Sequence, residues 1–214
     1  MLVLCIPTLN RFDLLVRCIA SARAGSVAPD RVLVVDNSGG QCPPIESVEI
    51  ITPRRNLGVA ASWNAMIERA GPEAQIIISN DDIVFAPDTI ERLLVAAENN
   101  VRAGTVSAID GQKFSLFYLN QRCAAEVGPF DEAFYPAYFE DNDFVRRMEL
   151  SGWQAISAPS AVEHAISATR AAMSDEEQAR SHRAFRRNAA YFVAKWGLMP
   201  HQGALYEAPF GVPA

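Results

Sequence analysis

Short runs of apolar residues recur along the first half of the chain, and each is ended by proline or by polar turn residues. The runs at 2–6, 32–35, 48–52 and 75–79 are too short for typical helices and are mostly apolar, which is typical of strands buried on both faces. Segments with helical spacing of apolar residues lie between several of them, so parallel strands joined by crossover helices are expected. The pattern predicts an α/β fold with a Rossmann-like, mostly parallel sheet flanked by helices.

The helix-like segments have recognisable starts and faces. Asn10 is expected to cap a helix whose apolar positions are Leu14, Leu15, Cys18, Ile19 and Ala22. Ser174 and Glu177 form a capping-box pattern at the start of a last helix, with Phe185, Ala189, Phe192 and Trp196 as its apolar stripe. Further elements are expected as follows: a helix after Gly58 that carries Asn64 and ends at about 70, helices at about 89–97, 121–127 and 140–151, and strands at about 104–109, 114–119, 154–157 and 161–164. The N-terminus of the helix after Gly58 is a candidate anion site, with an ordinary loop and cap as the alternative.

Length and composition limit the class of protein. The chain has 214 residues, half of them hydrophobic, and we expect a single domain over 1–214. There is no apolar run long enough to span a bilayer and no signal-peptide pattern, so a cytoplasmic location is expected, with the inner face of the membrane as an alternative. The net charge of −6 argues against binding to a nucleic-acid backbone. The four cysteines are widely spaced, which favours buried apolar packing over a zinc site.

Carboxylates follow two of the predicted strands. Asp36 ends the second run, and Asp81 and Asp82 follow the fourth. Because open α/β sheets bind ligands beyond the carboxyl ends of their strands, these side chains are expected to converge. Two adjacent aspartates repel each other, and a divalent cation between them and a phosphate would stabilise both in the ionised form. A pair of solvated turns is the alternative interpretation.

The segment 138–148 places another carboxylate on an apolar helix face. If it is helical, Asp141 shares an inward stripe with Phe144, Val145 and Met148. Asp141 then lies in the first helical turn beside Glu140, where acidic residues also complement the helix dipole. The two hypotheses are a general base at the rim of a cleft and a purely structural helix-start residue.

Five short motifs, in order, resemble glycosyltransferase family 2 over roughly residues 2–165. They are Ile6-Pro7-Thr8-Leu9-Asn10-Arg11, Val34-Val35-Asp36-Asn37-Ser38, Asn56-Leu57-Gly58 with Asn64, Asn80-Asp81-Asp82, and the stretch from Gly128-Pro129-Phe130-Asp131-Glu132 to Phe139-Glu140-Asp141-Asn142-Asp143. The resemblance implies the GT-A fold and inversion at the sugar's anomeric carbon. It also implies a nucleotide-binding half at about 1–110, a small acceptor-binding and catalytic half at about 111–197, and a tail at 198–214.

The resemblance assigns roles to individual residues. It implies that the nucleotide-sugar donor is bound by Pro7, Thr8, Asn10, Asp36, Asn56, Gly58, Asn64 and Asp81. Asp36 would accept from the base, which favours a UDP or dTDP donor. Asp82 and His164 would hold Mn²⁺ or Mg²⁺, although the Asn80-Asp81-Asp82 motif is not a strict Asp-x-Asp and leaves open which aspartate binds the metal. Asp141 matches the catalytic base, supported by Glu140. From the residues alone, the alternative for His164 is a hydrogen-bonded structural residue, which a lone histidine is more often than a ligand.

The chain lacks the Gln-x-x-Arg-Trp motif and the membrane spans that accompany processive synthases of this family, so transfer of a single sugar is expected. The acceptor is expected to be a glycan, a lipid-linked molecule or a protein, and a homo-oligomer is left open. Two other functions are considered: a nucleotidyltransferase, for which no glycine-rich triphosphate loop follows the first strand, and a non-catalytic module that binds sugar nucleotides or glycans.

Overall fold

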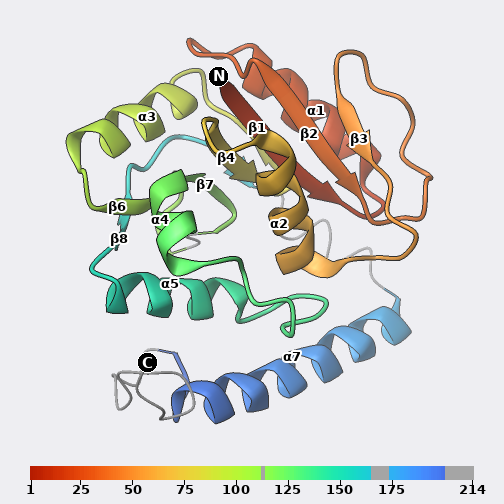
Figure 1. Ribbon diagram of the computed structural model, residues 1–214. Helices are drawn as coiled ribbons and strands as arrows, with labels where there is room; N and C mark the ends of the chain where they lie inside the picture. Colours follow the sequence, from red (N-terminus) through yellow and green to blue (C-terminus); the bar gives the residue numbers. More distant parts are fainter. Residues whose placement is uncertain (112–113, 165–173, 201–214) are drawn as a thin grey trace.

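The computed structural model describes residues 1–111, 114–164 and 174–200 (Figure 1). The helices are α1 Phe12–Arg23, α2 Gly58–Ala70, α3 Thr89–Asn99, α4 Gln121–Val127, α5 Glu140–Leu150 and α7 Asp175–Trp196. The strands are β1 Leu2–Thr8, β2 Arg31–Asp36, β3 Glu49–Ile51, β4 Gln75–Ser79, β5 Ile83–Val84, β6 Ala103–Ser107, β7 Leu116–Leu119, β8 Gln154–Ser157 and β9 Glu163–His164.

Seven strands form one sheet in the order β3-β2-β1-β4-β7-β6-β8. All neighbouring pairs are parallel except those of β7, which runs antiparallel to both β4 and β6. Strands from both predicted halves of the chain thus belong to the same sheet. A separate two-stranded pairing joins β5 to β9. The fold is α/β with a mostly parallel sheet, as predicted.

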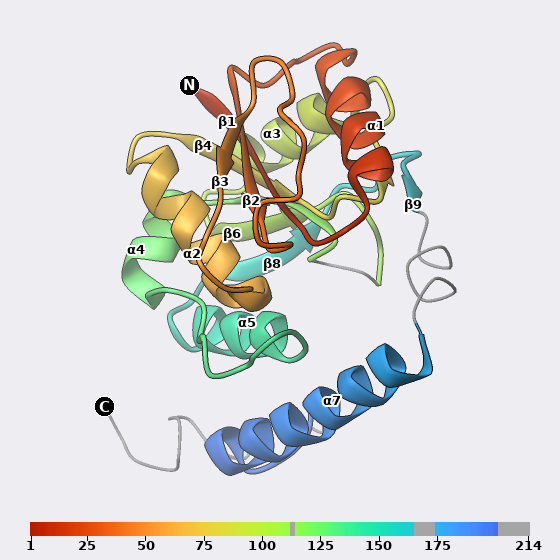
Figure 2. The same cartoon turned by 90° about the vertical axis from the view of Figure 1, so that its right-hand side faces the viewer.

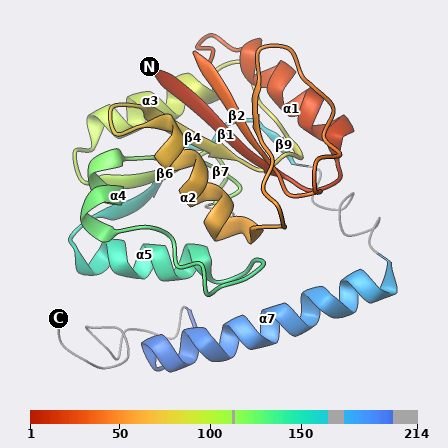
Figure 3. The ribbon, with the colours of Figure 1, turned by 45° about the vertical axis from the view of Figure 1, so that its right-hand side comes forward.

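Helices cover both faces of the sheet, with α1 on one side and α2 and α4 on the other (Figure 2). Because the central strands are buried on both faces, alternate residues of β1 feed two separate cores. Val3 and Cys5 pack with residues of α2, α4 and α5, whereas Leu4 and Ile6 pack with residues of α1 and α3. The long helix α7 runs beneath α5 (Figure 3) and forms a third apolar cluster with the segment before α5.

The strands at 75–79 and 154–157 and the helix at 121–127 have the predicted boundaries. Two local predictions were wrong. β1 continues through Pro7 to Thr8, and Asn10 is exposed and does not cap α1, whose N-cap is Arg11 without a side-chain hydrogen bond. The capping box of Ser174 and Glu177 is confirmed. Most of the predicted 198–214 tail lies outside the described residues, and no helix within them is both long and apolar enough to cross a membrane.

The buried face of α7 differs from the predicted apolar stripe in two ways: Phe185 is not part of it, and it includes polar residues. Phe185 keeps 45% of its surface exposed, whereas Phe192 and Trp196 are buried. Two polar residues, Asn188 and Lys195, share the buried face with them. The buried side of α7 is therefore partly polar. Its polar residues contact α5 and the segment that leads into it.

Candidate active site

The C-terminal ends of β1, β2 and β4 bring together Thr8, Asp36 and Asp81. Thr8 lies opposite Asp36 in the β1–β2 register, and its hydroxyl donates to Asp81 Oδ2 over 2.6 Å. Because β1 lies between β2 and β4, the parallel sheet places these side chains along one edge. The convergence predicted from the sequence is present.

Asp81 and Asp82 differ in their surroundings. Burial, together with the neighbouring charge of Asp82, raises the pKa of Asp81 to about 6, and the hydrogen bond from Thr8 acts in the opposite direction. Asp82 Oδ1 lies 3.1 Å from His164 Nε2. This contact follows from the β5–β9 pairing, which places Ile83 opposite His164. The isolated histidine is thus brought to one of the predicted metal ligands by a very short strand pair.

A carboxylate oxygen and an imidazole nitrogen are ligands that suit Mn²⁺, and the remaining positions of such an ion are commonly filled by substrate phosphates and water. The two side chains border a cavity of about 190 Å³, also lined by Leu14, Arg17, Ile83, Val84 and Glu163. Within residues 1–111, 114–164 and 174–200, no group of three or more His, Cys, Asp or Glu side chains is placed to hold a metal. The donor set fits an ion shared with a ligand better than an ion enclosed by protein.

Asp36 is almost completely buried and is held by its own loop. Its carboxylate accepts from the backbone N–H groups of Ser38, over 2.9 Å, and Cys42, over 3.1 Å, and from the Ser38 hydroxyl. Burial acts to raise the pKa of Asp36, but these hydrogen bonds outweigh it and hold the pKa below its ordinary value. Asp36 is therefore an ionised, acceptor-only group at the edge of the sheet, and a carboxylate has about four acceptor positions.

The start of α2 does not offer the free anion site that the sequence suggested. The backbone N–H groups of Leu57, Gly58 and Val59 donate to Asn37 Oδ1, Asn56 Oδ1 and Pro136 O, over 2.8, 2.7 and 2.7 Å. The first orphan donors of this helix are thus already satisfied within the protein. Asn56 closes this turn, and its predicted contact with the donor remains a prediction.

Gly58 faces the segment that leads into α5. Its φ is +77°, and an added Cβ would lie 2.7 Å from Pro136 O and 3.0 Å from the Tyr135 ring. Asn64, further along α2, donates to Phe130 O and Glu132 Oε1 and accepts from the Phe130 N–H. These two predicted donor-binding residues therefore fasten α2 to the 128–136 loop.

The first turn of α5 holds the two predicted catalytic carboxylates, but Asp141 does not take the buried, inward position that was expected for it. Glu140 is buried together with Phe144 and Met148, whereas Asp141 is half-exposed. Helical spacing allows a residue either three or four positions before Phe144 to share its face. In the structure it is Glu140, four positions before Phe144, that lies on the buried face. Asp141 Oδ1 accepts from the backbone and side-chain nitrogens of Asn142, both over 2.8 Å.

Glu140 Oε2 is buried and has no hydrogen-bond partner among the described residues. Burial, together with the charge of Asp141, raises the pKa of Glu140 to about 8. Near neutral pH the proton therefore resides mainly on Glu140. The arrangement separates a buried neutral carboxyl from a half-exposed carboxylate one residue later.

We expect Glu140→Gln to stabilise the protein at alkaline pH. The pKa of Glu140 is higher in the folded state than in the unfolded state. The contribution of this carboxyl group to the free energy of unfolding is therefore fully present below about pH 4.5 and is lost as pH rises through about 8. The amide of the variant does not titrate, and the variant should exceed the wild type by about 1 kcal/mol or more at pH 8.5 and match it near pH 4.5. Urea unfolding at both pH values measures this. The exposed Glu73→Gln serves as control, and equal pH profiles for wild type and Glu140→Gln would contradict the prediction.

The seven-stranded α/β sheet, with its single antiparallel inner strand and its acidic residues beyond the strand ends, defines the GT-A fold class. The structure of the mannosyltransferase PcManGT from Pyrobaculum calidifontis in complex with GDP-Man and Mn²⁺ matches with a TM-score of 0.61 at 15% identity. The match covers 74% of this chain and 55% of that one.

The sequence profile described as Glycosyl transferase family 2 matches residues 3–145, and the chain belongs to that family. A relative described as "Galactofuranosyl glycosyltransferase" from Leishmania donovani is 39% identical over 91 residues. Those residues are 41% of this chain and 20% of the relative, so the chain spans about a fifth of that protein.

Proposed function

We propose that this chain is a metal-dependent, inverting glycosyltransferase that moves one sugar from a nucleoside-diphosphate sugar to an acceptor hydroxyl. The observation that supports it best is the contact between Asp82 and His164 beside the Thr8–Asp81 hydrogen bond, at the sheet edge where this fold class binds nucleotides. The names of the two similar proteins, a galactofuranosyl glycosyltransferase and a mannosyltransferase bound to GDP-Man, support a hexose as the transferred sugar.

In the proposed site, Thr8, Asp36 and Asp81 bind the nucleoside, and Asp82 and His164 hold a Mn²⁺ or Mg²⁺ ion. When bound, such an ion would neutralise charge on the diphosphate leaving group. Burial and the charge of Asp82 raise the pKa of Asp81 even though the positive charge of Arg11 acts in the opposite direction. A cation shared with the diphosphate would supply further positive charge beside the two carboxylates.

Asp141 takes the proton from the acceptor hydroxyl while the oxygen of that hydroxyl attacks the anomeric carbon. Its half-exposed position leaves it accessible to an acceptor, while buried Glu140 is mostly protonated and leaves the basic oxygen on Asp141. The same attack displaces the nucleoside diphosphate from the opposite face, so the anomeric configuration inverts. Glu140 supports the base because it stays protonated in its buried position and so does not compete with Asp141 for the acceptor's proton.

We expect uridine or thymidine diphosphate to bind in preference to other nucleotides, because Asp36 is an ionised acceptor that suits the N3–H donor of uracil or thymine. Thermal-shift measurements with UDP, dTDP, GDP and CDP, each with Mn²⁺ or with EDTA, test this. A ligand at 100 times its Kd stabilises the folded state by about 2.7 kcal/mol, so a preferred nucleotide gives a clear shift. A larger shift with GDP or CDP would refute the assignment of Asp36. The preferred nucleotide then selects the donor for transfer assays with a panel of methyl glycosides.

A further inference from the structure

The segment that leads into α5 adopts an unusual backbone conformation. Tyr138 and Phe139, directly before Glu140, have φ values of 84° and 75°. Two consecutive non-glycine residues in the left-handed region are unfavourable and persist only where the surrounding structure holds them. The N-cap residue Phe139 makes no side-chain cap hydrogen bond, so α5 does not fix this turn by itself. α2 contributes the hydrogen bond from Val59 N–H to Pro136 O, and α7 contributes a larger set of contacts.

Asn188 of α7 is completely buried against this turn. Its side-chain nitrogen lies 2.8 Å from Ala137 O and 3.3 Å from both Tyr135 O and Tyr138 O. Its Oδ1 accepts from the guanidinium of Arg187, over 3.2 and 3.1 Å, which directs the NH₂ group toward the turn. An uncharged side chain with two donors thus satisfies carbonyl groups that point inward because of the left-handed turn.

The residues of the turn also use their own side chains to contact α7. The Tyr138 hydroxyl lies 2.6 Å from Ser181 Oγ. The Phe139 ring packs against Phe185 and Phe192, with ring centroids 5.1 and 5.6 Å apart. The contacts to residues 181, 185, 188 and 192 follow the spacing of one helix face.

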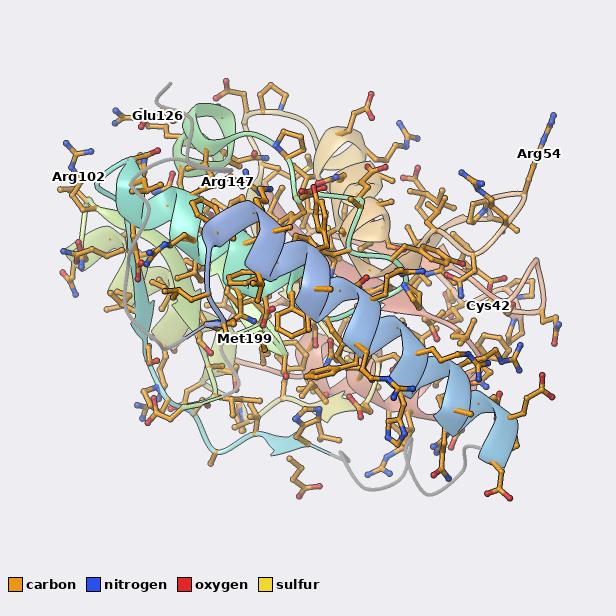
Figure 4. All side chains as sticks on the ribbon, turned by 90° about the horizontal axis from the view of Figure 1, so that it is seen from below. Cys42, Arg54, Arg102, Glu126, Arg147 and Met199 are labelled. Atoms are coloured by element: carbon orange, nitrogen blue, oxygen red, sulfur yellow. The ribbon has the colours of Figure 1, made fainter. Side chains whose placement is uncertain are left out.

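A second group of contacts fixes the first turn of α5 itself. Asp143 has no exposed surface and lies two residues after Asp141. Lys195 Nζ lies 2.7 Å from Asp143 Oδ1 and 2.7 Å from Asp131 Oδ2, and Trp196 Nε1 donates to Asp143 Oδ1 over 2.9 Å. The other Asp143 oxygen accepts from Arg147, which lies near the C-terminal part of α7 in the view from below (Figure 4). Helix α7 therefore holds both the entry to α5 and its first turn.

We infer that α7, which lies beyond the residues matched by the family profile, completes the active site, and that Asn188 is a positioning residue for Asp141. The inference rests on the proposed role of Asp141 as the base. Asn188 touches no reacting atom in this scheme. It fixes the backbone of 135–138, which leads into the first turn of α5 with Glu140 and Asp141, so its loss displaces the base and leaves the nucleotide edge of the sheet intact.

The test compares Asn188→Ala with Ala190→Gly in the full chain. Ala190 is exposed on α7, and glycine there weakens the helix without removing a contact to the turn. We expect Asn188→Ala to lower the kcat of sugar transfer by about tenfold or more, because a small displacement of a catalytic group is costly. The donor KM and the Mn²⁺-dependent thermal shift with the nucleotide should stay within about twofold of wild type. Ala190→Gly should keep wild-type kcat.

Two further variants make the result decisive. Ser181→Ala removes only the partner of the Tyr138 hydroxyl. It should lower kcat by about threefold with unchanged nucleotide binding. This variant tests the inference if Asn188→Ala does not fold. Asn188→Ala added to Asp141→Asn should cause little further loss, since a displaced base and an absent base have the same consequence.

If Asn188→Ala folds, a kcat within twofold of wild type would overturn the inference while Asp141→Asn remains inactive. A parallel loss of kcat and nucleotide binding would overturn it as well, because that is the signature of general destabilisation. If Asn188→Ala does not fold, a wild-type kcat for Ser181→Ala would overturn it. Full activity of Asp141→Asn would instead refute the proposed base, and with it the role of Asn188.

Discussion

Replacing Asp141 with Asn should lower the kcat of sugar transfer by at least about a hundredfold. The substitution nearly preserves the size of the side chain and its ability to accept from Asn142, but it removes the basic oxygen that the acceptor hydroxyl requires. Donor KM and the Mn²⁺-dependent thermal shift should remain close to wild type, because the nucleotide is proposed to bind at the ends of β1, β2 and β4. Steady-state kinetics with the preferred donor and a panel of methyl glycosides measure the effect.

The matched control is Glu149→Gln, which removes an exposed carboxylate from the same helix. It should leave kcat unchanged. If Asp141 only complements the helix dipole, Asp141→Asn should cost at most about 1 kcal/mol of stability and leave transfer nearly unchanged. An Asp141→Asn variant that keeps more than about a tenth of wild-type kcat, a loss below roughly 1.4 kcal/mol, would exclude Asp141 as the base. Glu140→Gln would then be examined in the same assay.

The sheet edge that carries Thr8, Asp36 and Asp81 was predictable because it depends on local patterns. A short apolar run buried on both faces specifies a strand, and the polar residue that ends it falls at the sheet edge whatever the rest of the chain does. Thr8, Asp36 and Asp81 converge for this reason. The contact between Asp82 and His164 was a different case: two very short strands create it across a large sequence separation, and only the family resemblance pointed to it.

The parts that sequence reasoning missed depend on partners distant in the chain. The start of α2 resembled a free anion site, but its N–H groups are used by Asn37, Asn56 and the Pro136 carbonyl. Helical periodicity did not distinguish Glu140 from Asp141 as the buried carboxylate, since both lie at a helical spacing from Phe144. Asn188 and Lys195 were overlooked, although polar residues on the same helix face as Phe192 and Trp196 signal buried hydrogen bonds.

Replacing Asp82 with Ala should abolish the Mn²⁺-dependent part of nucleotide binding. Asp82 is the carboxylate in contact with His164. Of these two proposed ligands only Asp82 is negatively charged, so its replacement would leave the cation with the imidazole alone. We expect the thermal shift with nucleotide and Mn²⁺ to fall to the value that the wild type shows with EDTA. The far-UV circular dichroism of the unliganded variant should match that of the wild type, because removing Asp82 also relieves its repulsion of Asp81.

The matched variants separate the metal ligand from a general loss of charge. His164→Gln should reduce the Mn²⁺ dependence in the same direction, since a neutral amide is a weaker ligand than imidazole for this ion. Asp110→Ala, at an exposed carboxylate outside the helices and strands, should behave as wild type. If wild-type protein binds nucleotide equally well with Mn²⁺ and with EDTA, the site does not use a metal, and the contact between Asp82 and His164 serves only to join β5 to β9. If Asp82→Ala keeps the Mn²⁺ response and Asp81→Ala loses it, the metal ligand is Asp81, and the hydrogen bond from Thr8 then orients that ligand.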